Sequence, residues 1–97
     1  MIVNERTTEK GLLVSVCDPD TLGETYESDD ISLTVTEDFY DGEELDESDV
    51  IEALSRATIA NIVGADSVAL AIEHGFVEEA NVLEVGSTVH AQMLRLA

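Results

Sequence analysis

Alternation of hydrophobic and polar residues predicts strands through the first third of the chain. An apolar run at Met1–Asn4 and a longer one at Gly11–Cys17 predict two strands, and the polar segment between them, which ends in a glycine, predicts a hairpin. Glu24–Ser28 is predicted to be extended. In Ile31–Thr36 every second residue is apolar, which is typical of a half-buried strand.

The middle of the chain has a helical period. An acidic loop over Glu37–Glu47 leads to two residues that can cap a helix, Asp46 and Asp49. Apolar residues then recur at helical spacing, so this helix is predicted to continue as far as Gly64. The apolar stripe consists of Ile51, Leu54, Thr58, Ile59, Ile62 and Val63.

A second helix and two more strands are predicted from the remaining pattern. Asp66 can cap a helix over Ser67–His74, and Gly75 can end it. Val82–Val85 and Val89–Leu96 are predicted strands joined by a glycine turn. Strands on both sides of a helical hairpin indicate one α+β domain over residues 1–97, with a mixed or largely antiparallel sheet.

The net charge of the chain says the most about the environment of the protein. The chain has 22 Asp and Glu against four Lys and Arg, a formal charge of −18, and the acids are spread over its whole length. Such a domain repels itself in dilute buffer, but molar salt shortens the Debye length to about 3 Å and screens the repulsion. The composition therefore indicates a halophilic protein; a nucleic-acid mimic and an acidic protein from an ordinary cell are the alternatives.

The sequence also predicts a cytoplasmic location without membrane contact. No apolar run approaches the ~20 residues that a bilayer requires, and the N-terminal residues lack the pattern of a secretory signal. Cys17 is the one cysteine, so no disulfide can form within the chain, which fits a reducing compartment. Because Cys17 ends an apolar run, we expect it in the core.

Neither a metal nor a cofactor is expected. A zinc site needs several converging ligands, whereas Cys17, His74 and His90 are far apart in the sequence. His74 would end the second helix, where the helix dipole favours an imidazolium. Asp18–Gly23, predicted to form one helical turn, and Glu37–Gly42 resemble calcium loops, but in each an apolar residue stands where an oxygen ligand is needed.

The closing strand carries the candidate site. Val89, Ala91 and Met93 share one face of it, so His90 and Gln92 share the other. An imidazole and an amide beside a glycine turn could contact a ligand or the backbone of a partner. The alternative is an ordinary polar face of an edge strand.

A set of short motifs resembles one family. The motifs occur in order along nearly the whole chain, and the family is the archaeal one catalogued as domain of unknown function 424. They are Gly11-Leu12-Leu13-Val14, Cys17-Asp18, Ala57-Thr58-Ile59-Ala60-Asn61-Ile62-Val63-Gly64, Ser67-Val68, Ala71-Ile72, Gly75 and His90-Ala91-Gln92. The resemblance implies an archaeal cytosolic protein associated with translation or RNA, without an established activity. It places the candidate binding residues at Asn61, Ser67, His90 and Gln92.

The leading hypothesis is a non-catalytic binding module that acts with the translation or RNA machinery through a protein or ribonucleoprotein partner. Four basic residues release few counterions, so direct contact with a protein is at least as well supported as contact with bare RNA. One alternative is a small enzyme in which His90 is the acid or base and Gln92 orients the substrate. Another is a protein–protein adaptor that uses the helical hairpin.

The charge argument makes a prediction about stability. We expect the melting temperature to rise steeply between dilute buffer and molar potassium chloride, because screening relieves the repulsion between carboxylates. Thermal unfolding followed by circular dichroism over a salt series measures this. A melting temperature that does not depend on salt would refute the halophilic interpretation.

Overall fold

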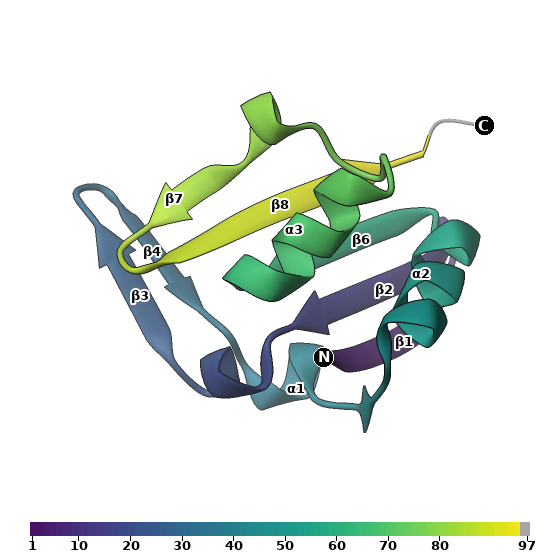
Figure 1. Ribbon diagram of the computed structural model, residues 1–97. Helices are drawn as coiled ribbons and strands as arrows, with labels where there is room; N and C mark the ends of the chain where they lie inside the picture. Colours follow the sequence, from purple (N-terminus) through teal and green to yellow (C-terminus); the bar gives the residue numbers. More distant parts are fainter. Residues whose placement is uncertain (96–97) are drawn as a thin grey trace.

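A six-stranded sheet organises the chain in the computed structural model, which describes residues 1–95 (Figure 1). Its strands follow the order β5-β1-β2-β6-β8-β7. They are β1 (Ile2–Thr8), β2 (Gly11–Cys17), β5 (Glu43–Glu44), β6 (Ile59–Val63), β7 (Leu83–Val85) and β8 (Thr88–Leu94). β2 and β6 run parallel and the other neighbours antiparallel, which confirms the prediction of an α+β fold with a mixed, largely antiparallel sheet.

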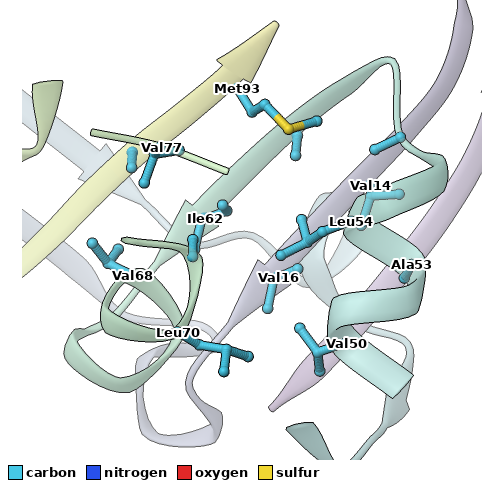
Figure 2. Packing of buried hydrophobic residues seen from close by; sticks show 14 of the residues in the cluster. Val14, Val16, Val50, Ala53, Leu54, Ile62, Val68, Leu70, Val77 and Met93 are labelled. Atoms are coloured by element: carbon cyan, nitrogen blue, oxygen red, sulfur yellow. The ribbon is translucent and has the colours of Figure 1, made fainter. Parts of the chain in front are cut away.

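Two helices cover one face of this sheet. α2 (Glu47–Arg56) and α3 (Ala65–Glu73) lie side by side over the central strands (Figure 1). Because side chains alternate along a strand, every second residue of β2, β6 and β8 points at these helices. Figure 2 shows the resulting core, in which Ile62 and Val16 of the sheet face Leu54 of α2 and Val68 of α3.

The opposite face is covered at one end only. A hairpin of β3 (Thr25–Ser28) and β4 (Ile31–Thr34) and the short helix α1 (Glu37–Tyr40) pack there. A second, smaller apolar cluster holds them on the sheet. Its buried members are Cys17, Val35, Tyr40 and Val63. The core position expected for Cys17 is therefore confirmed.

The predicted helical hairpin is wrong, because residues 59–63 form strand β6 between α2 and α3. α2 ends at Arg56, and Ala57 is already extended. The Thr58 amide then donates to the Leu12 carbonyl (2.8 Å), which starts the parallel pairing with β2. Apart from Asn61, residues 59–63 are apolar on both sides of the strand, and such a run does not distinguish a buried strand from a helix.

Other boundaries differ less. β1 continues to Thr8, well beyond the predicted end at Asn4. The segment predicted as an acidic loop contains α1 and β5. α1 forms there because its Tyr40 packs into the second cluster, and β5 pairs with β1. Of the two proposed caps of α2, Asp46 is the one used, since its carboxylate accepts the Asp49 amide at 3.0 Å. The helical turn after β2 is confirmed as a 3-10 turn, η1 (Pro19–Thr21), and a second one is η2 (Glu79–Asn81). β8 ends at Leu94, and the predicted strand end at residue 96 lies outside the described residues.

Burial of β6 makes a prediction about stability. Ile62 is fully buried between the sheet and the helices, so Ile62→Ala should lower the free energy of unfolding by roughly 2–5 kcal/mol. Ile31→Ala is the matched control, because Ile31 is 42 % exposed and should cost less than about 1 kcal/mol. Chemical denaturation in molar salt compares them, and equal losses would contradict the assignment of Ile62 to the core.

Candidate functional site: the open face of the sheet

The strand register aligns four polar side chains across the sheet. Asn61 of β6 pairs with Gln92 of β8 on one side and with Ser15 of β2 on the other, and Ser15 pairs with Asn4 of β1. Residues paired in register point to the same face of a sheet. Ile62, next to Asn61, is in the helix-covered core, so this row lies on the opposite face.

A second row lies beside the first, further from the β3–β4 hairpin. It consists of Arg6, Leu13, Ile59 and Leu94 in register. Leu94 is 61 % exposed, the highest value among the large hydrophobic residues in the described part of the chain. We call the uncovered part of the sheet the open face. It is formed by Leu13, Ile59, Asn61, Gln92 and Leu94, with His90 at its border.

This side of the sheet carries no carboxylate on its four central strands. Fifteen residues of β1, β2, β6 and β8 share the side of the open face, and none of them is Asp or Glu although the chain has 22 of these. They are Ile2, Asn4, Arg6, Thr8, Gly11, Leu13, Ser15, Cys17, Ile59, Asn61, Val63, Thr88, His90, Gln92 and Leu94.

His90 lies where the open face meets the second apolar cluster. It pairs with Val63 of β6 and with Leu83 of β7, so apolar side chains flank it on both sides. Burial lowers the pKa of its imidazole below the usual value, which favours the neutral ring. The predicted outward direction of His90 and Gln92 agrees with this arrangement: Gln92 is exposed and His90 is half-buried.

Ser67 does not belong to this group. It is buried at the start of α3, where its hydroxyl donates to Asp18 Oδ1 at 2.6 Å. The same carboxylate accepts the Ser67 amide at 2.8 Å and the Asp66 amide at 3.0 Å. Asp18, which directly follows β2, thus caps α3 from outside the helix. The expectation that Asp66 caps this helix is wrong, because Asp66 contributes its amide and not its carboxylate.

Gly64 makes room for this cap. Its φ is +110°, and a Cβ at this position would lie 2.3 Å from the Asp18 carboxyl carbon. The helix N-terminus, which could otherwise attract a phosphate, is therefore already occupied by a carboxylate of the protein. Sequence reasoning missed the contact of Asp18 with the start of α3. The available signals were the position of Asp18 directly after a buried strand and the glycine that begins α3.

The other candidate residues, His74 and Cys17, do not form a site. His74 is exposed at the end of α3, as predicted. Burial raises the pKa of the Cys17 thiol, so it is not activated as a nucleophile. Within residues 1–95, no three potential ligands converge on a metal site, and none of the helices is long and apolar enough to cross a bilayer.

Comparison with known proteins gives the family. A model described as a protein of unknown function (DUF424) matches residues 5–96. The chain belongs to the DUF424 family. Among solved structures, a crystal structure of an uncharacterized conserved protein from Methanopyrus kandleri matches it with a TM-score of 0.77 and 21 % identity, covering 99 % of this chain and 94 % of that one. At this identity the match establishes the fold alone. No curated protein matches the chain.

The buried cap predicts that two acids at the start of α3 in this DUF424 protein, Asp18 and Asp66, contribute unequally to stability. Asp18→Ala should lower the free energy of unfolding by roughly 1–3 kcal/mol, because it leaves two buried or part-buried amides and a hydroxyl without an acceptor. Asp66→Ala, which removes an exposed carboxylate in the same helical turn, should cost less than about 1 kcal/mol. Denaturation in molar salt measures both, and the reverse order would contradict the assignment of the cap.

Proposed function

We propose that this DUF424 protein is a non-catalytic binding module whose partner surface is the open face of the sheet. The observation that carries the proposal is the absence of Asp and Glu from that side of β1, β2, β6 and β8 in a chain with a formal charge of −18. Elsewhere the surface is rich in carboxylates, which keep a protein hydrated and separate in solution. A surface without them is suited to contact.

The residue types on the open face support the same interpretation. The centres of protein interfaces are depleted in charged residues and contain apolar side chains with a few hydrogen-bonding groups. Asn61 and Gln92 each offer an amide donor and acceptor, and Leu13, Ile59 and Leu94 provide apolar area next to them. These side chains stand on a rigid sheet, so little conformational entropy is lost when a partner binds.

Within the translation or RNA machinery, we propose a protein component as the partner rather than bare RNA. Three of the four basic residues already have partners in the protein. Arg56 contacts Glu5 (2.9 Å) and Glu52 (2.8 Å), and Arg6 and Arg95 donate to backbone carbonyls. Few cations are therefore available to displace counterions from a phosphate backbone. We further propose that the protein works in the cytoplasm of a halophilic archaeon, which its composition favours.

The enzyme alternative would depend on His90. A neutral imidazole can act as a base, but an efficient one is usually oriented by a second polar group. The cross-strand neighbours of His90 are Val63 and Leu83, and neither can orient the ring. This arrangement favours a binding surface over a catalytic site.

The proposal predicts that nearly isosteric substitutions that place charges on the open face weaken binding of the partner without unfolding the protein. Asn61→Asp combined with Gln92→Glu should change stability by less than about 1 kcal/mol, because neither residue is fully buried. It should reduce partner recovery at least about tenfold, because an unpaired charge buried in an interface costs several kcal/mol. Affinity capture from a halophilic archaeal lysate in molar salt measures this.

Ser32→Asp is the control, since it adds a charge on the exposed side of the β3–β4 hairpin, outside the open face. Protein, ribonucleoprotein and RNA are separated by treating the captured material with nuclease or protease. Undiminished capture by the folded double variant would refute the open face as the partner surface. If the double variant still captured the partner but lost a pH-dependent turnover, the result would instead support an enzyme.

A further inference from the structure

The outer edge of β8 is only partly occupied by β7. The Gly64 amide donates to the Val89 carbonyl (2.9 Å), and the Arg95 amide donates to the Thr58 carbonyl (2.8 Å). In an antiparallel ladder the residues that bond to one neighbour alternate with those that bond to the other. The backbone groups of Gln92 and Leu94 therefore point away from β6, toward the β7 side.

β7 does not reach these groups. It pairs with Thr88–His90 and begins at Leu83, opposite His90. Among residues 1–95, the backbone N–H and C=O of Gln92 and Leu94 have no hydrogen-bond partner. In the ribbon view β8 extends well past β7 in the direction of the C-terminus (Figure 1). The edge strand thus leaves a short open ladder directly beside the open face.

A hollow of about 260 Å³ lies against this ladder. It is bounded by the chain that follows α3 and by the strand itself. The lining residues are Gly75, Phe76, Val77, Glu78, Asn81, Gln92, Met93 and Leu94. The hollow therefore presents mainly polar surface, including the carboxylate of Glu78, with a smaller apolar part, next to unpaired backbone groups.

We propose that an extended segment of a protein partner adds to β8 as a further strand, pairing with Gln92 and Leu94 in line with β7. This inference deepens the proposed function and rests on it, because the side chains of the same two residues belong to the open face. Added strands gain affinity from backbone hydrogen bonds and specificity from pockets that accept alternate side chains. The hollow is such a pocket, and the open face continues under the other side of the added strand.

The lining of the hollow specifies the chemistry of the segment. Val77 and Met93 are buried, so Phe76 and Leu94 supply the apolar surface for a side chain, and the exposed carboxylate of Glu78 suits a neighbouring Lys or Arg. A second copy of this chain is a poorer occupant. It has only four basic residues to offer opposite Glu78, and three of them already have partners within the protein. The occupant is thus an extended segment in which basic and apolar residues alternate.

Leu94→Pro tests the backbone contact with the added strand separately from the contact of the side chain. The Leu94 amide is unbonded, so Leu94→Pro removes a donor that the fold does not use, whereas Leu94→Ala keeps it. We expect a short peptide of alternating Lys and Val to bind the full chain in molar potassium chloride. Its affinity for Leu94→Pro should be at least about tenfold weaker than for Leu94→Ala. Gln92→Pro is the second variant should Leu94→Pro fail to fold.

Amide hydrogen exchange locates the contact. Before the peptide is added, the amides of Gln92 and Leu94 should exchange faster than those of Ala91 and Met93, which bond to β6, and the peptide should slow them. The added strand would be overturned if the peptide bound the proline and alanine variants with equal affinity, or if it gave the amides of Gln92 and Leu94 no new protection from exchange. This holds even where capture of the partner still depends on Asn61 and Gln92. A dimer formed through β8 without the peptide would also overturn it. Failure of the capture experiment alone would refute the open face and not this pairing.

Discussion

The hydrogen bonds of Asp18 are the interaction on which the rest of the structure depends. They connect strand β2, strand β6, the start of α3 and the turn after β2. The Asp18 carboxylate receives three hydrogen bonds from the first turn of α3, while the Asp18 amide donates to the Val63 carbonyl and extends the pairing of β2 with β6. The Asp18 carbonyl accepts the Thr21 hydroxyl, which fixes the turn that leads to the β3–β4 hairpin. One buried residue thus positions a helix on one face of the sheet and the covering hairpin on the other.

The open face follows from that division. Near Asp18, β6 is buried on both sides, with Val63 under the hairpin cluster and Ile62 under the helices. Further along the same strand only the helix side is covered, and Asn61 and Ile59 remain half-buried. The hairpin and α1 are too short to cover the whole sheet. The uncovered part is therefore framed by rigid elements, which suits a surface that binds without rearranging.

The sequence predicts the elements that depend on local pattern and misses those that depend on pairing. The apolar run of β2 and the alternation in β8 are visible in the chain, and the outward direction of Gln92 follows from that alternation. β6 is not predicted, since Ile59 to Val63 fits both a helix and a strand until β2 and β8 are placed beside it. The cap is not predicted either, because Asp18 and Ser67 are far apart in the sequence and the two local signals do not pair them. The absence of carboxylates from one side becomes apparent only once the register brings residues from four strands together.

In the molar salt that we propose as the environment of this protein, the open face can use only some kinds of interaction. At molar ionic strength charges separated by more than about 3 Å are screened, so long-range attraction contributes little to recognition. Hydrogen bonds and the burial of apolar area are short-ranged and persist. The amides of Asn61 and Gln92, the exposed Leu94 and the open ladder of β8 supply both. Under the proposed function, a chain rich in surface carboxylates can therefore still recognise a partner, because one rigid side of its sheet is free of them.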